Sequence, residues 1–383
     1  MIKSLTATTR EIDDPQAAVT EILAMLAPEK NLLQNSVGII SCFSEFEDTG
    51  ALKAICDALP FPCVGTTTCL CSARNEIDEV LFAMIVLTSN DCEFKPLMIP
   101  ITEQYEQVIH ASINDMLEQT AEKPALFLSY FPLMNTVSGD MILSAIDNAT
   151  GGIPLFGMTT VDHTADYSSA KTICNGDGYS ETAVLCAVFG SPKVEFGIAS
   201  IDDSNIRKQK AIITESNGNT LIGVNGKLAI EYLEEIGYTR EEVCSGLGVV
   251  PLVIDYMDGT KSVVRAVFTH TPEGHVVCGG EMPVNATLGL AKHMEKSDVL
   301  KTTGVTLRTL AEKGSAILSY SCIARYLVLG MDNTAEAETL IETADGANYV
   351  FSYSGGEICP LPDANGKLKN IFHNYTIVFC RLS

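Results

Sequence analysis

Two short stretches of the chain share one skeleton of proline, glycine and paired threonines. They are FPCVGTTTCL at residues 61–70 and IPLFGMTTVDH at residues 153–163. Before each stretch stand a short apolar segment and an amphipathic helix pattern, and after it comes a second apolar segment. The chain must therefore accommodate at least two copies of one strand–helix–turn–strand unit.

A third and fainter copy of this unit appears near the end of the chain. The expected first and closing strands lie at 37–43 and 81–89 in the first copy, at 125–131 and 181–190 in the second, and at 316–321 and 375–382 in the third, where the stretch 349–358 ends in a glycine turn. This pattern predicts an α/β protein with mixed sheets built from repeated units. Gly and Pro interrupt two strands within 189–196, which predicts a boundary between parts 1–192 and 193–383.

Charge and cysteine usage limit the partners and the compartment. The net charge of −23 disfavours nucleic acid and anionic membranes as partners. No apolar run approaches the length of a membrane-spanning helix, and the first residues show no signal peptide. The 13 cysteines are scattered singly, as in a cytoplasmic protein with reduced thiols. Cys69 and Cys71 lack a second pair at zinc spacing, so we expect no metal.

The threonine turns have two possible roles. Glycine lets the backbone approach a ligand closely, and threonine hydroxyls both donate and accept hydrogen bonds. Two such turns can face one pocket, which would make ligand contacts of Gly65, Thr66, Thr67, Gly157 and Thr159. The alternative is that the threonines satisfy backbone groups of the turns.

Signatures of common enzymes are absent from the sequence. It contains no phosphate-binding loop, no dinucleotide fingerprint, no zinc-protease motif and no nucleophile elbow. Asp162 and His163 follow the second threonine turn, but neighbours in an extended segment point apart. A capping or solvated pair is the simpler interpretation there. We therefore expect a binding protein and not an enzyme.

The last third of the chain carries a second group of polar residues. Cys322 and Arg325 stand where a strand leads into a helix, a place that attracts anions and activates thiols. Glu357 follows two glycines, and His373 and Asn374 precede the last strand. Together these side chains could recognise an amino acid or a similar small polar ligand. The alternative is a structural ion pair between Arg325 and Glu357, with Cys322 a buried inert thiol.

These segments resemble the FIST family. SCIAR, YVFSYSGGEI and NIFHNYTIVFCRL resemble its C-terminal part, and FPCVGTTT, IPLFGMTT and GDGYSETAVLCAVFG resemble its N-terminal part. The resemblance covers nearly the whole chain and implies a cytoplasmic sensory module for small ligands such as amino acids. CLCS replaces the Gly-Glu-Ile that often follows the first turn in the family. The matching positions are Gly65, Thr66, Thr67, Gly157, Thr159, Asp162, Cys322, Arg325, Gly356, Glu357, His373 and Asn374.

The resulting hypothesis is a cytoplasmic sensor that holds a small polar ligand between its two parts. Arg325 would bind an anionic group of the ligand and Glu357 an amino group. A separate signalling protein, such as a kinase or cyclase, would supply the output. Two alternatives stay open: a haem-binding nitric oxide sensor, which the family resemblance suggests, and an enzyme with Cys322 as nucleophile. No other cofactor is expected.

Overall fold

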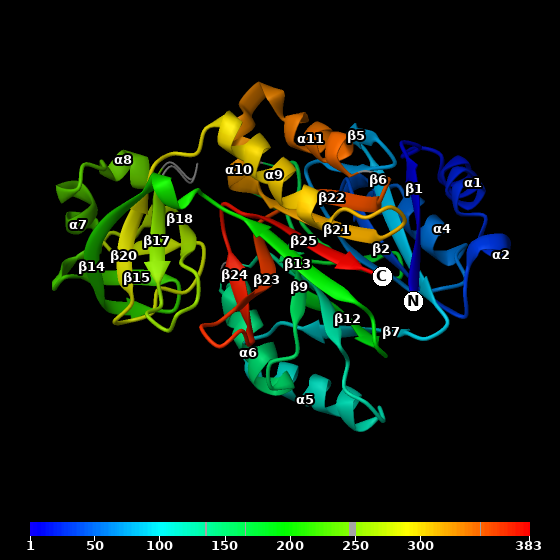
Figure 1. Ribbon diagram of the computed structural model, residues 1–383, viewed down its shortest axis with the longest axis horizontal. Coiled ribbons are helices and arrows are strands. Elements are labelled where there is room, and N and C mark those ends of the chain that lie inside the picture. The colour runs from blue at the N-terminus through cyan, green and yellow to red at the C-terminus, as the bar shows by residue number, and fades with distance from the viewer. Residues whose placement is uncertain (135, 165, 245–249, 345) are drawn as a thin grey trace.

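The computed structural model describes residues 1–134, 136–164, 166–244, 250–344 and 346–383. Three mixed sheets of six strands each form its main body, and a separate lobe extends from one side (Figure 1). The α/β class and the mixed sheets predicted from the sequence are confirmed. The three sheets also show that the faint third copy of the repeated unit is a full structural copy.

The three sheets have the same internal order. The first runs β1 (Ile2–Thr9), β6 (Phe82–Ser89), β2 (Asn35–Cys42), β3 (Cys63–Thr67), β10 (Thr172–Cys174) and β11 (Asp177–Tyr179). The second runs β7 (Glu93–Pro100), β12 (Thr182–Phe189), β8 (Leu126–Phe131), β9 (Leu155–Thr159), β23 (Gly356–Pro362) and β24 (Leu368–His373). The third runs β13 (Val194–Ala199), β25 (Ile377–Leu382), β21 (Ala316–Cys322), β22 (Asn348–Ser354), β4 (Cys71–Ala73) and β5 (Glu76–Asp78).

Each unit gives its hairpin to the sheet of another unit. The hairpin β4–β5 of the first unit joins the third sheet, β10–β11 of the second unit joins the first sheet, and β23–β24 of the third unit joins the second sheet. The exchange is therefore cyclic. It interlocks the predicted parts 1–192 and 193–383, whose boundary falls in the turn between β12 and β13.

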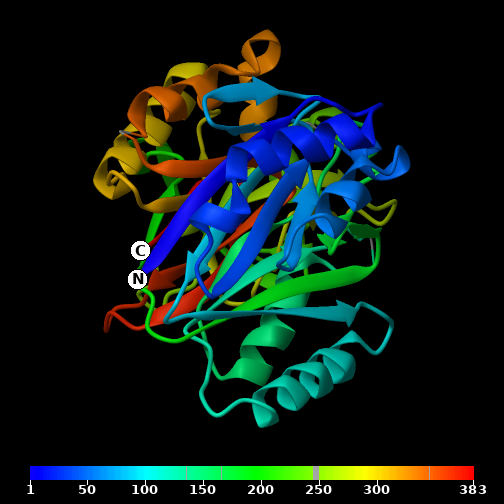
Figure 2. The same cartoon turned by 90° about the vertical axis from the view of Figure 1, so that its right-hand side faces the viewer.

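Helices cover the outer faces of the three sheets, and Figure 2 shows the blue, teal and orange groups on three different sides. The first group is α1 (Pro15–Leu26), α2 (Pro28–Asn31), α3 (Glu45–Asp48) and α4 (Ala51–Asp57). The second is α5 (Tyr105–Glu118) and α6 (Gly139–Thr150), and the third is α9 (Lys296–Leu310), α10 (Ile323–Leu329), η2 (Gly330–Asp332) and α11 (Ala335–Thr343). In the described part of the chain, no helix has the length and apolar character needed to span a bilayer.

The inner faces of the three sheets share one apolar core. Leu128 of β8, Leu318 of β21 and Ile39 of β2 are all fully buried in it. β6 and β12 lie inside their sheets and are buried along their whole length, which explains their uninterrupted apolar sequences. The hydroxyls of Tyr130 and Tyr320 meet at 2.9 Å in this interior.

The separate lobe is inserted between β13 and α9. Its sheet has the order β14 (Ile206–Asn217), β20 (Thr287–Ala291), β17 (Pro251–Asp255), β18 (Val263–His270), β19 (Val276–Cys278), β15 (Thr220–Val224) and β16 (Lys227–Leu228). An extra pairing between β14 and β15 closes this sheet on itself. The lobe also contains η1 (Asp203–Asn205), α7 (Ala229–Glu235) and α8 (Arg240–Val243), and it has its own apolar core.

A substitution at Gly157 tests the close contact between the parallel strands β8 and β9. A Cβ at this position would overlap the backbone carbonyl of Ser129 on β8. We expect Gly157→Ala to destabilise the protein by about 3 kcal/mol or more, because backbone must shift in a close-packed interior. The control is Gly304→Ala in α9, where the nearest atom to the new Cβ lies at an ordinary 3.4 Å. Equal denaturant midpoints for the two variants would contradict the strand contact.

Candidate functional site

The two threonine turns meet at the carboxyl ends of β3, β9 and β22. The Thr67 and Thr160 hydroxyl oxygens are 3.0 Å apart. Thr68 donates its hydroxyl hydrogen to the Tyr353 carbonyl at 2.9 Å, and Thr160 reaches the Thr67 carbonyl at 3.4 Å. The amide of Gly355 donates to the Thr159 carbonyl at 2.9 Å. Thr68 thus links the first unit to the third, Thr160 links the second to the first, and Gly355 links the third to the second. The three contacts form a closed ring, which we call the strand-end ring.

Most of the threonine hydroxyls are occupied by this structural role. Thr66 donates to the Thr67 carbonyl and Thr67 to the Val161 carbonyl, both at 2.9 Å. Gly65 and Gly157 allow β3 and β9 to approach β2 and β8, since a Cβ would overlap the Ile40 and Ser129 carbonyls. Backbone satisfaction, the alternative in the sequence analysis, therefore describes these positions better than ligand contact.

Thr159 and Asp162 differ from the other residues of the turns. Both are buried, and neither the Thr159 hydroxyl nor the Asp162 Oδ2 has a hydrogen-bond partner among the described residues. The Thr159 hydroxyl faces Gly139 at the start of α6. The other oxygen of Asp162 accepts hydrogen bonds from the Thr164 amide at 2.5 Å and its hydroxyl at 2.6 Å. A buried carboxylate oxygen without a partner is costly, so it marks this place as a candidate site.

Glu357 lies beside the ring on β23 and is fully buried. Burial raises its pKa to about 8, although hydrogen bonds from Ser354 and Thr376 and the charge of Arg325 act in the opposite direction. The Thr376 hydroxyl donates to Glu357 at 2.6 Å, and Ser354 donates to its other oxygen. Glu357 is therefore mostly uncharged at neutral pH. The expectation that it pairs with an amino group of a ligand as a charged carboxylate does not fit this environment.

Cys322 is buried near Glu357. Burial raises the pKa of its thiol well above the usual range, and the neighbouring Glu357 adds to the effect. The thiol thus stays protonated, whereas a nucleophile must be a thiolate. Its environment supports the inert-thiol alternative and disfavours the Cys322 enzyme.

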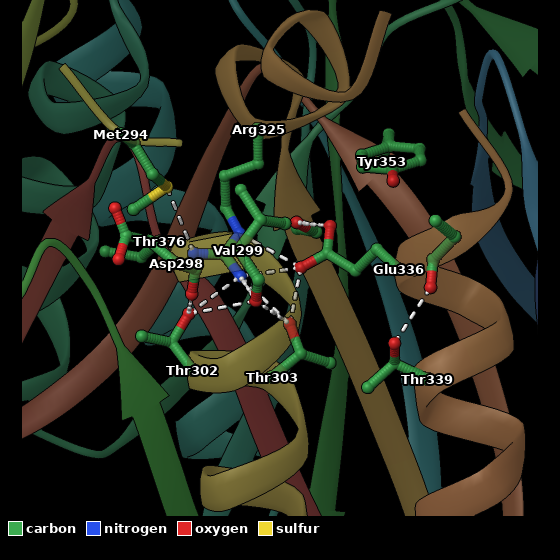
Figure 3. A network of polar contacts seen from close by, with 12 residues as sticks. Met294, Asp298, Val299, Thr302, Thr303, Arg325, Glu336, Thr339, Tyr353 and Thr376 are labelled. Atoms are coloured by element: carbon green, nitrogen blue, oxygen red, sulfur yellow. Dashed lines mark hydrogen bonds and ion pairs between the residues drawn. The ribbon is translucent and has the colours of Figure 1, made fainter. Parts of the chain in front are cut away.

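Arg325 is held inside the protein by Glu336 and not by Glu357 (Figure 3). Its Nη2 lies 2.7 Å from a Glu336 carboxylate oxygen, and Nη2 also donates to Thr303 at 2.9 Å. Ser321 donates to the other Glu336 oxygen at 2.8 Å. Both members of the pair are fully buried. Arg325 is therefore not available to an anionic ligand as expected, and the structural ion pair has a different acidic partner from the one the sequence suggested.

His373, Asn374 and Gly356 also have internal partners. His373 Nε2 lies 2.9 Å from the Cys359 carbonyl, and burial lowers the pKa of the imidazole to about 3, so it is neutral. Asn374 accepts a hydrogen bond from the Ala266 amide of the lobe at 3.2 Å and thereby joins lobe and body. Gly356 pairs with Thr159 across the sheet and leaves room for the Phe372 ring. His373 Nε2 is therefore engaged by the Cys359 carbonyl and is not free to bind a haem iron.

Sequence reasoning missed three residues near Asp162 and Glu357. Ser354 and Thr376 carry the Glu357 hydrogen bonds, and both stand inside the motifs that contain the predicted residues. Tyr167 is half-buried, and burial with the nearby Cys69, Cys322 and Asp162 raises its pKa to about 12. Tyr167 stands in a loop without a periodic pattern of apolar residues, so nothing in the sequence indicated that it lies near Asp162.

Family comparison matches most of the chain. The FIST N domain model matches residues 36–227, and the FIST C domain model matches residues 229–360. The chain belongs to the FIST family. FIST domains are sensory domains that bind small ligands in signalling. The two models meet at the start of α7 in the lobe, so the FIST C domain contains most of the lobe and most of the third unit.

Solved structures resemble this FIST protein only distantly. A cyanuric acid hydrolase from A. caulinodans is 8% identical with a TM-score of 0.40, and the match covers 100% of this chain and 98% of that one. A chorismatase is 10% identical with a TM-score of 0.35, over 100% and 99% of the two chains. Scores this low carry no argument about activity. No curated protein matches the chain.

The buried Glu357 predicts a specific pH dependence of stability. Its pKa rises from 4.5 to about 8 on folding, so its contribution is complete below pH 4.5 and is lost as pH rises through 8. We expect the Glu357→Gln variant to gain stability relative to the wild type by about 1 kcal/mol per pH unit between pH 5 and 8. Urea unfolding at several pH values measures this difference, with the exposed Glu103→Gln as control. Parallel stability curves for wild type and Glu357→Gln would contradict the assigned environment.

The Arg325–Glu336 pair predicts a loss of stability when one partner is removed. We expect Arg325→Met and Glu336→Gln each to cost about 3 kcal/mol, because each leaves a buried polar group unpaired. The double variant should cost less than the sum. Lys296→Met and Asp332→Asn break an exposed ion pair and should cost about 1 kcal/mol or less. Additive losses at Arg325 and Glu336 in denaturant titrations would show that the pair is not coupled.

Proposed function

We propose that this FIST protein is a small-ligand sensor whose ligand binds beside the strand-end ring, with Asp162 as its principal contact. The observation that carries the proposal is the buried Asp162 Oδ2, which has no hydrogen-bond partner among the described residues. A ligand with an ammonium group, such as an amino acid or a small amine, would supply the missing donor. Charge-assisted hydrogen bonds of this kind are strong when they are shielded from water.

The surroundings of Asp162 support a small polar ligand. The Asp162 carboxyl group lies close enough to Cys69 and Tyr167 to interact with them electrostatically. Tyr167 interacts in the same way with Cys69 and Cys322. Glu357 is mostly neutral, so it does not supply a countercharge for the ammonium group. In this proposal Thr159 and Glu357 are neighbours of the ligand. Arg325 does not contact the ligand and instead stabilises the third unit through its ion pair with Glu336.

The proposal also includes the cellular compartment of the protein and the way in which its signal is passed on. All thirteen cysteines are unpaired thiols, and twelve of them are buried, which supports a reducing compartment such as the cytoplasm. Binding at the strand ends would move the segment that follows Thr160, because Asp162 belongs to it. A separate signalling protein, such as a kinase or cyclase, would read this change.

Calorimetric titration of a panel of amino acids and small amines tests the proposal. We expect one class of amine to bind the wild type and to lose about ten-fold or more in affinity in Asp162→Asn, since a charged hydrogen bond becomes a neutral one. Asp166→Asn is the matched control, because Asp166 is exposed in the same segment. Unchanged affinity in Asp162→Asn would remove Asp162 from the site. An equal loss of affinity in both variants would indicate that the net charge of the protein, and not a direct contact with Asp162, determines amine binding.

A further inference from the structure

A cavity of about 300 Å³ lies where the lobe joins the body. Its walls come from the segment that leaves β13, from the turn before β18 and from α9. They include Ser200, Lys261, Lys301, Thr302 and Thr306. This volume is at the lower end of the range for small-molecule sites. Lys261 belongs to the lobe and Lys301 to the body, so an occupant would contact both.

The two lysines make this cavity locally basic on a strongly acidic protein. The chain carries a net charge of −23. Among the described residues, neither ammonium group has a carboxylate within ion-pair distance. Asp202 also lines the cavity, but its Oδ1 accepts hydrogen bonds from the Ser204 amide at 2.9 Å and hydroxyl at 2.7 Å. The Ser204 hydroxyl hydrogen bond contributes most to lowering the Asp202 pKa, and Lys301 and Lys261 add to it, so both lysines act on the same region.

Ser200 provides a second and independent indication that a ligand binds in this cavity. Its hydroxyl oxygen is buried and has no hydrogen-bond partner in the described part of the chain. Ser200 lines the cavity together with both lysines. A hydroxyl donor that lines the same cavity as two ammonium groups without ion-pair partners among the described residues matches the requirements of a tetrahedral oxyanion, which accepts several hydrogen bonds and carries two charges.

We propose that this cavity binds a phosphate group, either as free phosphate or on a small phosphorylated metabolite. The lysines would supply charge, and Ser200 would donate a hydrogen bond to a phosphate oxygen. The remaining volume would accept the organic part of a metabolite. This site goes beyond the amine site at Asp162 and does not depend on it.

The position of the cavity connects it to the strand-end ring. Ser200 and Lys261 also line a smaller cavity of about 10 Å³, which reaches His373 and Thr376. Thr376 donates its hydroxyl hydrogen to Glu357. Thr302, in the wall of the larger cavity, accepts a hydrogen bond from Arg325 at 3.2 Å. Phosphate would therefore bridge lobe and body next to the residues that surround Glu357, as a co-ligand that fixes the lobe.

Titration of inorganic phosphate into the full-length protein tests this proposal. Calorimetry in a chloride buffer at constant ionic strength should show one saturable site in the wild type. We expect Lys261→Gln and Lys301→Gln each to weaken binding about ten-fold, because each removes one charge-assisted contact, and the double variant to abolish it. Ser200→Ala should weaken it about three-fold. Lys313→Gln removes an exposed lysine outside the cavity and should leave the affinity unchanged.

One further arm decides between the sources of the anion, and two more arms serve as controls. A sugar phosphate that binds more tightly than inorganic phosphate would indicate a metabolite, and equal affinities would indicate free phosphate. Acetate at the same ionic strength should not compete. The proposal is overturned if the wild type shows no saturable binding of phosphate or sugar phosphates, or if Lys313→Gln weakens binding as much as Lys301→Gln. Asp162→Asn should leave phosphate binding intact, so failure of the amine site and failure of this site are distinguishable.

Discussion

Hydrogen bonds between the carboxyl ends of three parallel strand pairs link the three units of this molecule above their shared apolar core. Each sheet contributes one such end to the strand-end ring, and each contact crosses from one unit to another. The exchanged hairpins make the same cyclic connection at the level of strands. Each single connection joins two units, and neither cycle is complete until all three units are in place. The fold therefore places polar backbone and hydroxyl groups where three apolar sheets converge, and this makes a polar site possible inside an apolar interior.

Within that polar region, two carboxyl groups have different environments. Glu357 is fully buried and receives two hydroxyl hydrogen bonds, but burial still keeps it mostly neutral. Asp162 has one oxygen bonded to Thr164 and one oxygen without a partner among the described residues. The first group contributes to the architecture, and the second has the properties of a recognition group. The lysine-lined cavity at the lobe has the opposite charge, so the two proposed sites would select different ligands.

The repeated unit was predictable because its signal is local. Apolar periodicity and the glycine–threonine turns recur in sequence, and they indicated the strands, the helices and the meeting of the two turns. The hairpin exchange was not predictable, because strand partners such as Ser352 and Cys71 are far apart in the chain. The partner of Arg325 was missed for a related reason. Glu336 stands in a helix rich in acidic residues, where nothing in its sequence separates a buried carboxylate from solvated ones.

The most direct test of this account is an experimental electron-density map of the protein as purified from cells. The account predicts density for a small molecule beside the strand-end ring, with a hydrogen-bond donor within contact distance of the Asp162 oxygen that the protein leaves unsatisfied. The account is contradicted if that oxygen is bonded by a protein group, or if it is occupied only by water in protein that has been supplied with saturating amines.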